Sequence, residues 1–129
     1  MEKSDLVKFW LDSAAEDLEV CKSLFEKKHY SWCLFIGHLV LEKTLKALWL
    51  NNYYPEPHPW IHNLAKLAQQ IPLQLTEEKN NFLLDVNNFY LSGRYPEDKK
   101  EFYKICNRKY AQKNLKAIKD FYQWLLTQF

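Results

Sequence analysis

Three side chains that could do chemistry lie four residues apart in an otherwise apolar segment. His38, Glu42 and Lys46 occupy positions i, i+4 and i+8, so a helix would place all three on one face. Polar groups on such a face need partners. We favour a structural interpretation, in which Glu42 pairs with Lys46 and His38 is hydrogen-bonded. The pattern also leaves open a phosphate or nucleotide site charged by Lys43 and Lys46. His38 or Glu42 would then supply a hydrogen bond.

Two further candidate positions lie later in the chain. His62 follows a connector whose proline-rich part is residues 53–59, and it lies at the predicted start of a helix. Its imidazole could cap that helix, contact a ligand or only anchor the connector. Arg94 offers five fixed donors suited to phosphate or carboxylate, and Tyr95 offers a flat ring for stacking. Arg94 could equally pair with Glu42 or with a helix C-terminus. The candidate ligand-binding residues are therefore Arg94, Tyr95, Lys46, Lys43, Glu42, His62 and His38, and no catalytic residue is assigned.

Charge is distributed unevenly along the chain. Residues 1–63 carry 7 Lys against 9 Asp and Glu, whereas residues 64–129 carry 11 Lys and Arg against 7 Asp and Glu. Between positions 99 and 119 the basic residues recur at three- and four-residue steps and could form a face that binds RNA phosphates. We favour a simpler interpretation, in which this face is solvated and complements the acidic first helix, within the bundle or across a dimer.

Other common chemistries have little support in the sequence. It has no glycine-rich phosphate loop, no nucleophile motif and no metal-ligand cluster, so we expect no metal and no cofactor and favour a binding module over an enzyme. Its three cysteines lie in apolar patterns and are expected to be buried thiols. Asp12, Glu16 and Asp17 are interpreted as surface charge. With no signal peptide and no apolar run of roughly 18 residues, we expect a cytoplasmic protein without a membrane segment.

These candidates must be positioned by helices. The 129 residues suit one domain, residues 1–129, and two glycines leave few tight turns. Apolar residues recur at helical steps in five segments of the chain. Pro72 ends the third of these segments. The predicted fold is an all-α four-helix bundle with an additional short helix. We expect Ser4 or Asp5 to cap the first helix, Thr76 to cap the fourth, and Glu97-Asp98 to form a short turn. The predicted helical segments are Leu6–Phe25, about Ser31–Asn52, the short Ile61–Ile71, Thr76–Tyr90 and Ala111–Phe129.

The order of several short motifs resembles that of the HEPN family across nearly the whole chain. Each motif alone is weak, and their order and spacing are moderately specific. The family often has an acidic residue after the histidine, where this chain has Asn63, and after the proline, where this chain has Glu97. The first departure weakens the transfer of a role to position 63. The motifs are Ala14-Ala15-Glu16-Asp17-Leu18, Tyr30-Ser31-Trp32, Glu42-Lys43-Thr44-Leu45-Lys46-Ala47, His62-Asn63-Leu64 and Arg94-Tyr95-Pro96.

This resemblance implies an all-α, up-and-down four-helix bundle that is usually dimeric and binds nucleotides or RNA. Such proteins often work beside a small nucleotidyltransferase in a two-component, toxin–antitoxin-like system. Ribonucleases of the family carry an arginine followed, four to six residues later, by a histidine. The two arginines here are Arg94 and Arg108, and the last histidine is His62, so this motif is absent and the chain resembles the non-nuclease branch.

The expected function is therefore a homodimeric binding module with a nucleotidyltransferase as its partner protein. Arg94, Lys46 and Lys43 would hold phosphate groups, while Tyr95 or His62 would contact a base or ribose. One alternative is an atypical ribonuclease whose site is built from His38, Glu42, His62 and Arg94, since histidine can act as a general acid or base near neutral pH. The other is a purely structural dimerisation domain.

Overall fold

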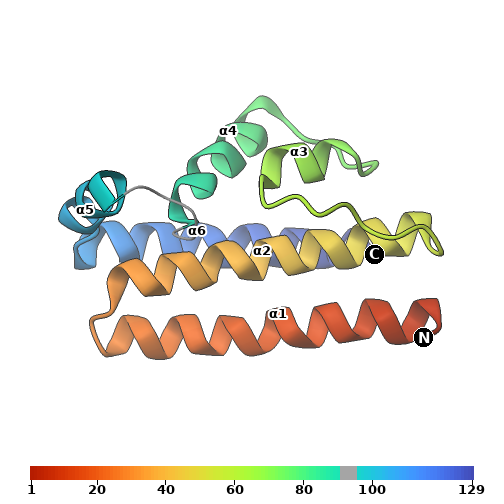
Figure 1. The fold of residues 1–129 in the computed structure, drawn as a ribbon, viewed down its shortest axis with the longest axis horizontal. Helices are drawn as coiled ribbons and strands as arrows, with labels where there is room; N and C mark the ends of the chain where they lie inside the picture. Colours follow the sequence, from red (N-terminus) through yellow and green to blue (C-terminus); the bar gives the residue numbers. More distant parts are fainter. Residues whose placement is uncertain (91–95) are drawn as a thin grey trace.

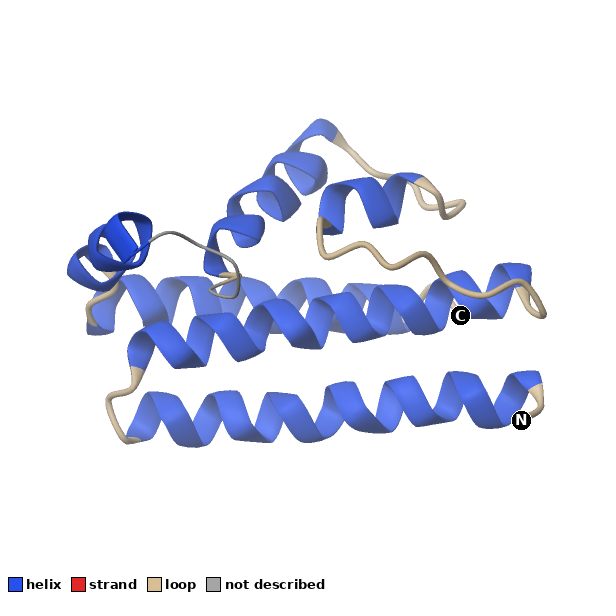
Figure 2. Cartoon of the chain, in the orientation of Figure 1, coloured by secondary structure: helices blue, strands red, loops and turns tan. Residues whose placement is uncertain are grey.

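The structure, a computed structural model, describes residues 1–90 and 96–129 and is helical throughout these ranges apart from turns and connectors (Figure 2). The all-α bundle predicted from the sequence is confirmed. The described elements are α1 (Lys3–Glu26), α2 (Tyr30–Tyr53), α3 (Leu64–Gln69), α4 (Glu77–Val86), the 3-10 turn η1 (Asn87–Phe89), α5 (Pro96–Ile105) and α6 (Arg108–Leu126).

Helix α2 is the centre of the bundle. Figure 1 shows α1 and α2 as an antiparallel hairpin, with α6 packed beside α2 and with α3 and α4 covering a further side. The chain runs up and down through α1, α2, α4 and α6, while α5 lies at one end between α4 and α6. Because neighbours surround α2, its apolar residues are buried around most of its circumference.

Gly37 lies where α2 packs tightly against α6. A Cβ atom at this position would lie 2.7 Å from Cδ1 of Ile118, a fully buried side chain of α6. Real Cβ atoms are not found that close to another carbon, so an alanine here would force Ile118 to shift. The absence of a side chain at Gly37 therefore allows the two helices to pack closely.

Helix ends agree only in part with the sequence-based predictions. Thr76 caps α4 as predicted, because its Oγ1 accepts a hydrogen bond from the backbone N–H of Lys79 at 3.1 Å. The prediction of Ser4 or Asp5 as the cap of α1 was wrong. That helix begins at Lys3, and Glu2 precedes it without a side-chain cap bond. Asp5 instead lies in the first turn, where its charge still favours the helix dipole.

Two other segments differ from the prediction for a local reason. Helix α3 begins only at Leu64, because Asn63 caps it by accepting a hydrogen bond from the N–H of Lys66, and Ile61 stays in the connector. The predicted short turn at Glu97-Asp98 is the first turn of the ten-residue helix α5. Pro96 opens this helix, at a position where its missing N–H is not needed.

The three cysteines are buried and unpaired, as predicted. Burial raises the pKa of the Cys106 thiol to about 12, and a hydrogen bond with Cys33, together with burial, raises the pKa of the Cys21 thiol. The same hydrogen bond lowers the pKa of the Cys33 thiol, so only the Cys21 and Cys106 thiols are held protonated and are poor nucleophiles for this reason. Across the two described ranges, none of the helices has the combination of length and apolar character that a membrane span requires.

Candidate functional site

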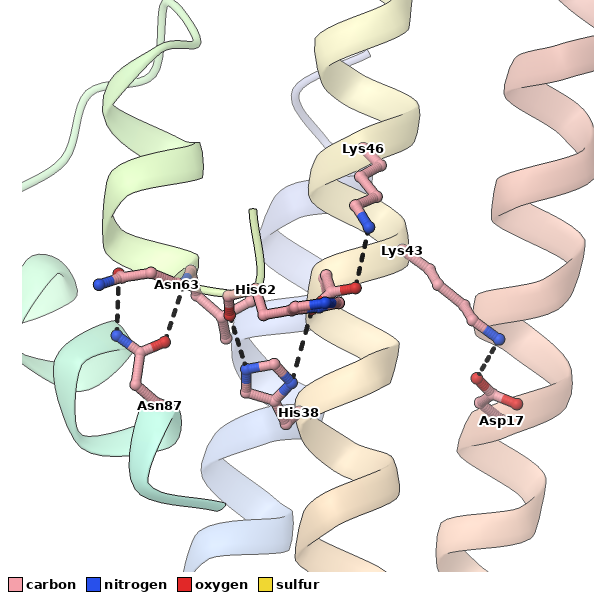
Figure 3. Close-up of polar contacts among 9 residues, drawn as sticks. Asp17, His38, Lys43, Lys46, His62, Asn63 and Asn87 are labelled. Carbon is pink, nitrogen blue, oxygen red and sulfur yellow. Dashed lines mark hydrogen bonds and ion pairs between the residues drawn. The ribbon is translucent and has the colours of Figure 1, made fainter. Parts of the chain in front are cut away.

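A buried carboxylate on α2 is the centre of a polar network. Glu42, His38 and Lys46 lie on one face of the helix, at 4%, 0% and 3% exposure. The Oε2 atom of Glu42 accepts a hydrogen bond from Nζ of Lys46 at 2.9 Å, and its Oε1 atom accepts one from Nδ1 of His62 at 2.9 Å. The two contacts that the structural interpretation predicts are present, because Glu42 pairs with Lys46 and His38 is hydrogen-bonded (Figure 3).

His38 fixes the backbone of the connector rather than presenting a reactive group. Its Nε2 lies 3.0 Å from the carbonyl oxygen of His62. Because a carbonyl can only accept, Nε2 must carry the proton, and the neutral ring then has a bare Nδ1. That atom has no hydrogen-bond partner among the described residues and lies 3.9 Å from Oε1 of Glu42. Burial lowers the pKa of His38 to about 4, although the Glu42 carboxylate opposes this shift.

His62 is held in place on several sides while its side chain stays 51% exposed. Since the Glu42 carboxylate accepts, Nδ1 of His62 donates, and no hydrogen bond from the described residues occupies Nε2. The ring stacks on Tyr90 with a centroid distance of 4.8 Å and an interplanar angle of 16°. Asn87 bonds both the Asn63 side chain and the N–H of Leu64, which fixes the backbone next to His62 (Figure 3).

Aromatic rings surround the ammonium group of Lys46. Its Nζ lies 5.5 Å from the ring centroid of Trp10 on α1 and 5.9 Å from that of Trp60 in the connector. The imidazole of His58 contacts both indoles, at centroid distances of 5.1 Å and 5.4 Å. Trp60 itself is 86% exposed, so one face of this aromatic group is open to solvent.

Lys43 does not join this network. It follows Glu42 by one residue and therefore points about 100° away around the helix, toward α1 (Figure 3). There its Nζ pairs with Oδ2 of Asp17 at 2.6 Å and donates to Oγ of Ser13 at 2.8 Å. Asp17 is therefore a partner in an ion pair between helices, whereas the sequence interpretation had placed it among the surface charges.

The structure thus brings together four of the seven predicted site residues, His38, Glu42, Lys46 and His62. Arg94 and Tyr95 lie outside the described residues. Sequence reasoning did not select Trp10, His58, Trp60 or Tyr90 as part of the site, although the aromatic residues close to His62 in the connector were a usable signal. Within the described ranges, no group of three or more His, Cys, Asp or Glu residues could hold a metal ion.

The sequence and the fold were compared with those of known proteins. No match was found among curated protein sequences. The structure is similar to the crystal structure of TT1696 from Thermus thermophilus, with a TM-score of 0.78 over 95% of this chain and 98% of the other. The two sequences are 18% identical, so this likeness shows the fold alone. The HEPN domain profile matches residues 7–128, and the chain therefore belongs to the HEPN domain family.

Proposed function

We propose that this HEPN protein binds a nucleotide or RNA at the exposed edge of the His62 network. The observation that carries the proposal is the state of the His62 ring. One nitrogen is fixed by the buried Glu42 carboxylate and one face stacks on Tyr90, yet half of the side chain is open to solvent. A ring held in this way through Nδ1 leaves Nε2 as an acceptor for a ribose hydroxyl.

The neighbouring aromatic groups suit a base. Trp60 is the most exposed large aromatic side chain in the described ranges, and stacking of a base on an exposed aromatic ring is worth about 1–3 kcal/mol. Lys46 lies behind this ring and supplies positive charge, although Glu42 compensates much of it. Arg94 and Tyr95 are proposed from the sequence as phosphate and base contacts. Lys43, which pairs with Asp17, is not part of this proposal.

Equilibrium binding of ribonucleotides and a short single-stranded RNA tests the proposal. We expect His62→Gln and Arg94→Ala each to weaken binding roughly tenfold, which corresponds to about 1.4 kcal/mol. His29→Gln, at an exposed histidine in the turn between α1 and α2, is the matched control. Circular dichroism of each variant separates loss of a contact from loss of the fold. Unchanged affinity in both test variants would remove these residues from the site.

We also propose that the protein is a homodimer and works with a nucleotidyltransferase. The support is the behaviour expected of the family, together with the large aromatic side chains that the surface exposes, which include Phe9, Trp32 and Trp60. Native mass spectrometry of the protein taken gently from its host reports subunit number, bound nucleotide and partner protein in one observation. A bare monomer would contradict this part of the proposal.

A specific observation also favours a second candidate, an atypical ribonuclease. A carboxylate that accepts a hydrogen bond from Nδ1 of an imidazole and leaves Nε2 without one suits a general base, and among the described residues Glu42 and His62 have this arrangement. If this candidate is correct, the wild-type protein should cleave RNA in the presence of a chelator, and the His62→Ala variant should lose that activity. Absence of cleavage at high protein concentration rules it out. If nucleotide binding is absent as well, a structural dimerisation domain is the function that remains.

A further inference from the structure

A hollow on a different side of the molecule is lined mostly by lysines. It has a volume of about 560 Å³ and lies between the C-terminal part of α1 and the outer face of α6. None of its lining residues belongs to the His62 network. The lining residues are Phe25, Lys109, Gln112, Lys113, Leu115, Lys116 and Lys119.

The positive charge of this hollow is largely uncompensated within the chain. Among the residues that the structure describes, no carboxylate lines it. Lys116 pairs with Asp120 at 3.0 Å, but both side chains are well exposed, and such pairs contribute little. Lys109, Lys113 and Lys119 form no ion pair with any residue in the ranges 1–90 and 96–129. No ion pair joins α6 to α1 in those ranges, so direct ion pairs do not provide the charge complement that the sequence interpretation expected between these lysines and the acidic first helix.

The lysines are arranged as a row rather than a point. Positions 109, 113, 116 and 119 are spaced by three or four residues and so lie along one side of α6, over a length of about 15 Å at 1.5 Å per residue. Phe25 and Leu115 supply apolar surface in the same hollow. The guanidinium of Arg108 lies over the Phe25 ring at 5.1 Å, at the first residue of α6.

The chemistry of the row favours phosphate over carboxylate as the group that it binds. Lysine ammonium groups act as point charges on flexible stems and bind phosphates from many directions, whereas selective carboxylate recognition usually employs the fork of arginine. The arginine at this place already lies over Phe25. A line of point charges beside apolar and aromatic surface fits a linear polyanion that carries bases.

We propose that this lysine row, with Phe25 beside it, binds the phosphate backbone of single-stranded RNA. The proposal shares RNA as a ligand with the proposed function but concerns a separate surface, so each can fail alone. Binding here is independent of base sequence and depends strongly on salt, since each phosphate contact releases a condensed counterion.

The test is fluorescence anisotropy of a labelled oligouridine of about 12 nucleotides, titrated with the full-length protein at several salt concentrations. We expect the Lys109→Gln/Lys113→Gln double variant to bind roughly tenfold more weakly at low salt. The slope of log K against log salt should fall in magnitude by about 1.4, because a single strand contributes about 0.7 per phosphate contact. Both lysines are exposed, so the variant should keep its fold, which circular dichroism checks.

A matched control variant distinguishes binding at the hollow from nonspecific electrostatic attraction by the net charge of the protein. Lys100→Gln/Lys104→Gln removes the same charge from exposed positions of α5, in the same basic segment but outside the hollow. We expect this variant to keep most of the wild-type slope. An equal loss in both double variants would overturn the proposal, since net charge alone would then explain binding. Absence of oligouridine binding by the wild-type protein would overturn it too.

Two further measurements identify which ligand binds and which surface binds it. Inorganic triphosphate should compete with oligouridine only weakly. If triphosphate binds in the hollow while oligouridine does not, the hollow takes small phosphates and the RNA proposal fails. His62→Gln should leave the salt slope unchanged. A protein that binds mononucleotides through His62 but not oligouridine keeps the proposed function and loses this inference, and the reverse result keeps only this inference.

Discussion

Helices α2 and α6 both carry ionisable side chains at three- and four-residue spacing, and they use them in opposite ways. On α2 the side chains of His38, Glu42 and Lys46 are buried, and their partners come from the same helix and from the connector. On α6 the side chains of Lys109 and Lys113 are exposed and form no ion pair in the described part of the chain. The spacing is similar, but the surroundings differ.

The difference shows that burial, rather than residue type, decides what a charged pattern can do. A charge in a poorly hydrated interior must be paired, and removing one partner leaves the other with a desolvation cost of several kcal/mol. Such a network fixes the structure, here the position of the His62 ring. An exposed charge costs almost nothing to keep unpaired, so it contributes little to stability and remains available for a ligand.

The largest expected effect comes from removing the centre of the buried network. Glu42→Ala leaves the ammonium of Lys46 buried without its carboxylate and removes the acceptor for His62. We expect the free energy of unfolding to fall by about 3–5 kcal/mol, measured by urea titration of the circular dichroism signal. Glu101→Ala, which breaks an exposed pair with Lys104, is the control and should cost less than about 0.5 kcal/mol. A loss below about 1 kcal/mol in Glu42→Ala would contradict our account of the network.

The second prediction concerns pH. The folded-state pKa of His38 is about 4, below the 6.5 expected for the unfolded chain, so the unfolded state binds the proton first as the pH falls. The stability contributed by the neutral His38 is complete above pH 6.5 and is lost progressively as the pH falls toward 4. At about 1.4 kcal/mol per pKa unit, the loss is about 3 kcal/mol.

Urea titrations across this pH range measure the effect as a difference between proteins. His38→Gln keeps an N–H donor for the His62 carbonyl but cannot titrate, so its stability should fall less steeply than that of the wild type between pH 6.5 and 4. His29→Gln controls for the loss of a histidine at an exposed position. Parallel curves for the wild type and His38→Gln would show that burial does not depress the pKa of this residue.

The third prediction separates the two partners of Glu42. Lys46→Met keeps a buried side chain of similar length but removes the ammonium, and with it the cation–π contacts with the indoles of Trp10 and Trp60. Glu42 would still accept a hydrogen bond from His62, so we expect a loss of about 1–3 kcal/mol, smaller than that of Glu42→Ala. Urea unfolding measures it. If Lys46→Met were as damaging as Glu42→Ala, the His62 hydrogen bond would contribute nothing to holding the carboxylate.

The sequence predicts interactions between residues that are close together in the chain better than interactions between distant segments. The shared face of His38, Glu42 and Lys46 and the cap at Thr76 depend on neighbours within a few residues, and both were predicted correctly. The meeting of His62 with Glu42 depends on the path of a proline-rich connector across twenty residues, which periodicity does not specify. Trp10 and Asp17 reach α2 from another helix, so their roles depend on how α1 packs. Lys43 was predicted to bind phosphate. Its position in the sequence gives its direction around the helix but does not show that Asp17 lies in that direction.

The smallest expected effect makes the comparison between the two helices direct, because it repeats the Lys46→Met substitution on α6. Lys113→Met removes an exposed ammonium that no described carboxylate pairs with, so the free energy of unfolding should change by less than about 0.5 kcal/mol. The same variant should nevertheless reduce the magnitude of the salt slope for oligouridine binding by about 0.7. A stability loss as large as that of Lys46→Met would mean that Lys113 has a structural partner, such as an acidic surface of a second chain. An unchanged salt slope, with unchanged stability, would mean that Lys113 is only a solvated charge.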